Sequence, residues 1–141
     1  MSLKMHRFKV DKLVRDNHPQ IMRESGMQVV ERQMDQDEFL GRLKDKIFEE
    51  AAEVMDAKDR DELCAELADL LEVMQMLAKV KGIVWADVEG FAAQKRAIRG
   101  GFDGRTYITH VTLPNTHPLL ESYRKCADRY PEIPITGTDS F

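Results

Sequence analysis

Two long runs without a helix breaker constrain the fold of this 141-residue chain more than any other feature. Neither glycine nor proline interrupts residues 42–58, and a second such run ends at Lys81, just before Gly82. Asp35 and Glu38 have the spacing of a capping box at the start of the first run. Only the charged sequence DAKDRD separates the runs. Two long helices with so short a link predict an antiparallel αα-hairpin.

Shorter elements flank this hairpin, and together they predict an all-α fold. Residues 105–113 alternate between apolar and polar side chains, which indicates a short extended segment. We interpret residues 4–113 as one domain, residues 114–141 as a C-terminal extension to which the sequence assigns no role, and residues 1–3 as a cloning remnant. The further helices that we expect run from Pro19 to Gly26, from Trp85 or Asp87 to Arg99, and from about Pro118 to Tyr130.

Composition narrows the class of protein. The formal net charge of -4 argues against a general nucleic-acid binder, and no apolar run approaches the roughly 20 residues that span a bilayer. Two cysteines make no disulfide framework, and we expect Cys64 to be a small core residue. Because the start of the chain lacks the apolar core of a signal peptide, we expect a cytoplasmic protein without membrane or nucleic-acid partners.

Acidic residues on the two hairpin helices carry the chemistry. Helical residues three or four positions apart share a face, and at about 100° per residue Glu66 and Asp69 border apolar residues of the second helix. Glu49, Glu50 and Glu53 border apolar residues of the first helix in the same way. The two acidic edges can therefore meet across the hairpin. The motifs are EEAAE, with Glu49, Glu50 and Glu53, and ELAD, with Glu66 and Asp69.

Five carboxylates in a partly apolar groove lose hydration and repel one another. A hard cation offsets that cost, and Mg²⁺ (or Mn²⁺ as a substitute) binds oxygen ligands and also takes phosphate oxygens. More than four acids favour two ions. No histidine follows these glutamates by three positions, which excludes the di-iron bundles. The alternative is an acidic helix face that is merely solvated.

The motifs resemble those of the all-α NTP pyrophosphatase superfamily, which includes MazG-like proteins and phosphoribosyl-ATP pyrophosphohydrolase. That superfamily has EExxE followed by ExxD, and both are present. KLVRDNHPQIM resembles the KLVRDxIP start of a small MazG-like branch, although His18 replaces the usual aliphatic residue, and KRAIRGGFDGRTYI resembles its KxxxRGGF segment. The similarity covers about residues 10–110.

The resemblance implies Mg²⁺-dependent cleavage of the α–β phosphoanhydride of a nucleoside triphosphate, which gives a monophosphate and pyrophosphate. It also implies four metal ligands, while Glu49 holds a second ion or orients the attacking water. Basic residues should complete a phosphate site, although such residues near helix ends also complement the helix dipole. The implied ligands are Glu50, Glu53, Glu66 and Asp69, and the phosphate-binding candidates are Lys95, Arg99, Lys46, Lys12 and Arg15, followed by Arg96 and Arg105.

We therefore expect a hydrolase that clears unwanted nucleotides. The alternatives are a phosphoribosyl-ATP pyrophosphohydrolase, which the KLVRD and RGGF segments disfavour by resemblance, and a helical module that binds nucleotide without turnover. The apolar surface of the second helix is wider than one partner helix can cover. We accordingly predict a homodimer or a dimer of dimers, with two hairpins forming a four-helix-type bundle.

Overall fold

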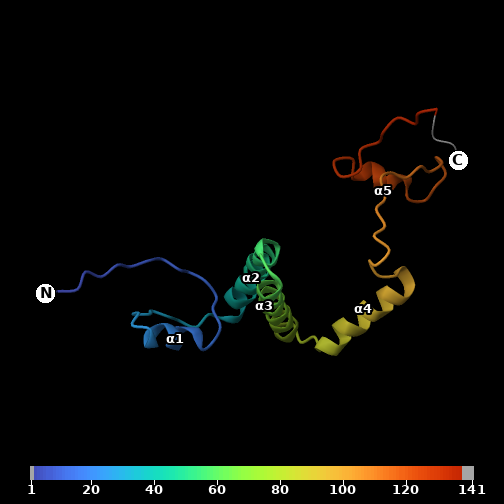
Figure 1. Ribbon diagram of the computed structural model, residues 1–141. Coiled ribbons are helices and arrows are strands. Elements are labelled where there is room, and N and C mark those ends of the chain that lie inside the picture. Colours follow the sequence, from blue (N-terminus) through green and yellow to red (C-terminus); the bar gives the residue numbers. More distant parts are fainter. Residues whose placement is uncertain (1, 138–141) are drawn as a thin grey trace. The chain divides into compact units, whose positions relative to one another are not determined.

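The computed structural model describes residues 2–137, which contain five helices and no β-strand. The all-α prediction is confirmed (Figure 1). The chain divides into two compact units between Gly100 and Gly101, and the first unit carries the first four helices. The helices are α1 (His18–Glu24), α2 (Gln36–Asp56), α3 (Arg60–Val80), α4 (Trp85–Arg99) and α5 (Leu120–Lys125).

The hairpin of α2 and α3 begins each helix with an aspartate cap. The Asp35 side chain accepts a hydrogen bond from the Glu38 backbone N–H at 2.8 Å, and Asp59 accepts one from Glu62 at the same distance. The Glu38 carboxylate does not return to complete the predicted capping box. It accepts two hydrogen bonds of 2.7 Å from the Arg32 guanidinium instead, because a charged bidentate donor outcompetes a backbone N–H.

Glycine ends α3 as the sequence predicts. The N–H of Gly82 donates to the Lys79 carbonyl at 3.0 Å, and the N–H of Ile83 donates to the Ala78 carbonyl at 2.8 Å. These two bonds define a Schellman motif, which requires a left-handed residue, and Gly82 has φ 69°. Gly26, with φ 98°, ends α1 in the same way.

The first long helix ends at Asp56, where the charged sequence DAKDRD begins, because Ala57 adopts ψ 131° and leaves the helical region. Other expectations need correction. The C-terminal helix spans only Leu120–Lys125 and has no capping side chain among the described residues, so little supports its extension to Tyr130. Residues 105–113 form no strand, since the described chain offers no second strand to pair with them.

Few residues of the described chain are buried, and most of them lie on α2 and α3. Leu43 on α2 and Ala78 on α3 are the buried apolar positions of these helices, with 2% and 7% exposure. Cys64, expected in the core, is exposed, because α2 covers only one side of α3. Within residues 2–137, no helix is both long enough and apolar enough to cross a membrane.

Alanine substitution of two glycines should change the stability of the hairpin in opposite directions. Gly82→Ala forces an L side chain into the left-handed region and should lower the free energy of unfolding by about 1–2 kcal/mol. Gly41→Ala, inside α2, should raise it by about 0.5–1 kcal/mol. An added Cβ meets no atom within 4 Å at either site. The backbone conformation alone therefore decides whether each substitution raises or lowers the free energy of unfolding. Urea unfolding at one protein concentration measures the free energy of unfolding of both variants. If both substitutions raised it, or both lowered it, the assignment of Gly82 as the cap of α3 would be contradicted.

Candidate metal centre

Three acidic side chains from the two hairpin helices converge. Glu50 and Glu53 lie three positions apart on one face of α2, and Glu66 reaches them from α3. Each residue offers one carboxylate oxygen, and the three oxygens lie within 4.8 Å of one another. We call these three residues the carboxylate cluster. The structure thus brings together three of the five acids singled out in the sequence, all with oxygen ligands.

The carboxylate cluster has oxygens that the protein does not satisfy. Glu50 is only 6% exposed, and its Oε2 is buried without a hydrogen-bond partner within residues 2–137. The same holds for Oε2 of Glu66. Burial raises the pKa of the Glu50 carboxyl, although Lys46 opposes the effect. The neighbouring Glu53 carboxylate raises the pKa of Glu66, and burial adds to it.

Buried carboxylate oxygens without donors require a cation or a proton. The cluster offers only hard oxygen ligands, from two glutamates on one helix and one on the next. That set suits Mg²⁺ or Mn²⁺, which prefer carboxylates and water, and does not suit zinc or copper sites built from His and Cys. The residues present therefore fit a divalent hard cation.

Lys46 lies one turn before the cluster and compensates part of its charge. Its ammonium donates to Oε1 of Glu49 at 3.2 Å and lies 3.4 Å from Oε1 of Glu50. Burial alone would lower the pKa of Lys46, but the two carboxylates outweigh burial and raise it. Partial burial likewise opposes the shift of Glu49, whose pKa is lowered by hydrogen bonds from Lys46 and Lys12. Glu49 is therefore ionised at neutral pH.

The remaining acid, Asp69, is not one of the three whose oxygens meet within 4.8 Å, although its charge helps to raise the pKa of Glu50 and Glu66, and it is held by Arg15. The Arg15 guanidinium donates to Oδ1 of Asp69 at 2.6 Å, and this bond raises the pKa of Arg15. Lys12, from the same irregular segment, donates to Oε1 of Glu49 at 3.3 Å. Both cations were singled out as phosphate-binding candidates, and here they contact carboxylates.

The basic candidates on α4 do not join this site. Lys95, Arg96 and Arg99 are exposed in the C-terminal half of α4, and the described chain gives their side chains no ion pair or hydrogen bond. Cations in a last helical turn interact favourably with the helix dipole, which accounts for their position. Arg105 lies beyond the unit that carries the acids.

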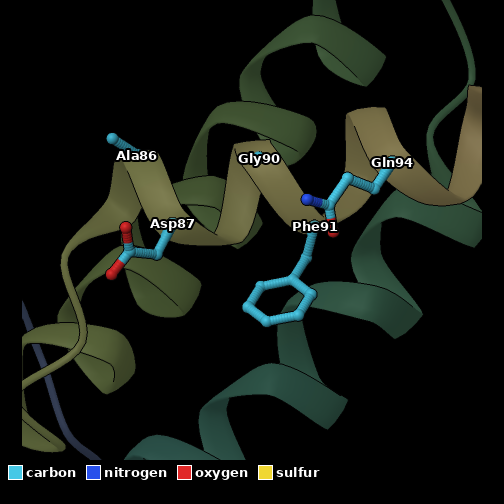
Figure 2. Close-up of a pocket in the computed structure, with 5 residues that line it drawn as sticks. All are labelled: Ala86, Asp87, Gly90, Phe91 and Gln94. Atoms are coloured by element: carbon cyan, nitrogen blue, oxygen red, sulfur yellow. The ribbon is translucent and has the colours of Figure 1, made fainter.

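A separate hollow lies on one face of α4. Figure 2 shows the Phe91 ring projecting from this helix, with the other residues that line the hollow. None of the predicted site residues lines the hollow, so it is distinct from the carboxylate cluster. Its lining residues are Ala86, Asp87, Gly90, Phe91 and Gln94.

A family model matches the part of the chain that carries these acids. The family model described as phosphoribosyl-ATP pyrophosphohydrolase matches residues 21–96, which is more than half of the chain and includes all five acids. The chain therefore belongs to the phosphoribosyl-ATP pyrophosphohydrolase family, a MazG-like group of all-α enzymes. Membership implies a pyrophosphohydrolase, which is a hydrolase. No curated protein and no solved structure matches the chain.

Glu66→Gln should stabilise the metal-free protein. The substitution removes one of three adjacent charges, so the melting temperature in EDTA at neutral pH should rise. It should also reduce the further rise that millimolar Mg²⁺ produces in the wild type, where binding to the native state adds RT ln(1 + [L]/Kd). Glu89→Gln, at an exposed position on α4, is the matched control. A lower melting temperature for Glu66→Gln in EDTA would contradict repulsion in the cluster.

Proposed function

We propose that this protein is a Mg²⁺-dependent nucleoside triphosphate pyrophosphohydrolase that yields a nucleoside monophosphate and pyrophosphate. The observation that carries the proposal is the buried Glu50 carboxylate, whose unpartnered oxygen lies with Glu53 and Glu66. Family membership supports the reaction class. Clearance of unwanted nucleotides is the role that we propose, and the cytoplasm remains its predicted location.

The carboxylate cluster and Asp69 are the residues that we propose to hold the cation. Bound Mg²⁺, for which Mn²⁺ could substitute, would neutralise charge that develops on the phosphoryl oxygens. The chain positions the ligands through the helical spacing of Glu50 with Glu53 and of Glu66 with Asp69. Their rigid helical attachment supplies the orientation that phosphoryl transfer requires.

Glu49 is the group that we propose to orient the attacking water or to hold a second ion. Its Oε1 is held by Lys46 and Lys12, and the described residues leave Oε2 without a bond. An ionised carboxylate can accept a hydrogen bond from water and direct it in line with the leaving pyrophosphate. Lys46, Lys12 and Arg15 lie next to these acids and are the phosphate-binding residues that we propose. Lys95 and Arg99 keep that role only as a weaker proposal.

Phosphoribosyl-ATP is the second candidate substrate, and the family match favours it. The KLVRD and RGGF segments, which favour a simple triphosphate by resemblance, lie outside residues 21–96. The matched region contains the acids that act on the phosphates, which both substrates share. Specificity between them would depend on contacts with the base and sugar.

Product analysis tests this function. The protein is incubated with Mg²⁺ and a panel of triphosphates that includes phosphoribosyl-ATP, and products are identified by chromatography. Monophosphate plus pyrophosphate is expected, and the substrate with the highest kcat/KM decides between the two candidates. Diphosphate plus phosphate would contradict the proposed bond. Mg²⁺-dependent nucleotide binding without turnover would indicate a binding module.

Variants of two ligands complete this test. Glu53→Gln and Asp69→Asn should each lower kcat/KM by at least about 100-fold, because a lost metal ligand removes several kcal/mol of transition-state stabilisation. Glu89→Gln removes the same charge from an exposed position of α4 and should leave turnover unchanged. Circular dichroism checks that each variant folds. Wild-type turnover in both ligand variants would refute the site.

We also propose a homodimer or a dimer of dimers, because α3 exposes a row of large apolar side chains. Leu67 and Leu71 are 47% and 42% exposed, and Leu63 and Met74 accompany them. A stable single copy does not normally leave such a face uncovered. A second hairpin would bury it in a four-helix bundle.

Leu67→Lys should therefore shift the protein towards a monomer. The substitution places a charge in the apolar row, whereas Glu72→Lys places the same group on an exposed position of α3 and should preserve assembly. Light scattering during gel filtration measures the mass of each variant. A wild type that elutes as a monomer would contradict the proposal.

A further inference from the structure

Two cations of the N-terminal segment contact the acids that lie outside the carboxylate cluster. Arg15 donates to Oδ1 of Asp69 at 2.6 Å, and Lys12 donates to Oε1 of Glu49 at 3.3 Å. These contacts join residues 54 and 37 positions apart in the sequence. We call the segment from Asp11 to Arg15 the basic strap. It connects two of the five acids to a part of the chain that belongs to neither hairpin helix.

The basic strap is attached by exposed contacts. The side chains of Lys12 and Arg15 are 57% and 62% exposed, and residues 2–15 contain no helix or strand. Asp11 has φ 45°, a left-handed conformation that costs energy for a residue with a Cβ. Exposed ion pairs contribute little and exchange readily. Lys46 differs because its side chain is only 19% exposed and extends from α2 itself.

The position of Asp69 indicates the role of the basic strap. It follows Glu66 by three positions on α3, so the two carboxylates share a helical face. The acids whose oxygens meet within 4.8 Å are nevertheless Glu50, Glu53 and Glu66, and Asp69 is not among them. Its Oδ1 is engaged by Arg15. The guanidinium thus occupies an oxygen that a cation in the cluster would otherwise attract.

We propose that the basic strap competes with a divalent cation for Asp69 and Glu49. In the metal-free protein, Arg15 and Lys12 neutralise these acids. When a cation occupies the cluster, Asp69 turns to it and releases Arg15, which becomes free to bind a substrate phosphate. The strap thereby orders the two events, with metal before nucleotide. This inference rests on the proposed metal-dependent function and adds a regulation of the same site.

Calorimetric titration with Mg²⁺ alone, at fixed ionic strength and without nucleotide, tests the competition. Arg15→Gln removes the competitor and should tighten Mg²⁺ binding by about two- to fivefold, which is the range that an exposed ion pair supports. Lys12→Gln should act in the same direction and serves as a second variant should Arg15→Gln not fold. Arg7→Gln is the matched control. Arg7 precedes the basic strap in the irregular segment of residues 2–15, is exposed, and has no ion pair in the described chain. Its Mg²⁺ affinity should equal that of the wild type.

A second readout separates competition from a merely structural role. At saturating Mg²⁺, Arg15→Gln should raise the KM for the triphosphate, so that metal binds more tightly and substrate more weakly in one variant. Loss of structure would weaken both. If the wild type binds Mg²⁺ and Arg15→Gln binds it equally or more weakly, the strap proposal is overturned and the metal site stands. If the wild type binds no Mg²⁺ in the millimolar range, the metal site and the strap proposal are both overturned.

Discussion

Carboxylates that share a partly apolar groove lose hydration and repel one another, and the arrangement between α2 and α3 depends on how this cost is offset. Glu50 shows the problem most clearly, since it is buried and one of its oxygens has no donor in the described chain. A hairpin selected for stability alone would place apolar side chains there. The cation that we propose would offset the cost of burying these acids.

The protein offsets the charge of these acids in two ways that differ in permanence. Lys46 is built into α2 one turn before Glu50 and is mostly buried, so its compensation is constant. Arg15 and Lys12 come from an irregular segment and remain exposed, so their compensation is removable. In the function that we propose, the compensation by Lys46 would stay in place while Arg15 and Lys12 make room for a cation and for phosphates.

The sequence predicted those parts that local rules decide. Asp35, Gly82 and the two runs without a helix breaker that the charged link separates specify the hairpin, and helical spacing placed Glu50 beside Glu53. Contacts that depend on tertiary structure were not predictable in this way. The pair between Arg15 and Asp69 spans 54 positions and involves a segment without periodicity, so no pattern encodes it.

The prediction for Cys64 was wrong for a related physical reason. Periodicity tells which side of a helix is apolar, but it does not tell how much of that side the same chain covers. α2 covers part of α3, and Cys64 lies on the remainder. The length of α5 was overestimated because the absence of a breaker permits a helix but does not stabilise one.

The short link from Ala57 to Asp59 limits where residues can be inserted or deleted during evolution. Glu53 lies just before the link and Glu66 lies soon after it, each on a helical arm of fixed length. Inserting or deleting one residue within either arm would turn its acids by about 100° away from those of the other. Length variation among related sequences should therefore be tolerated beyond the two motifs and excluded from the arms between them.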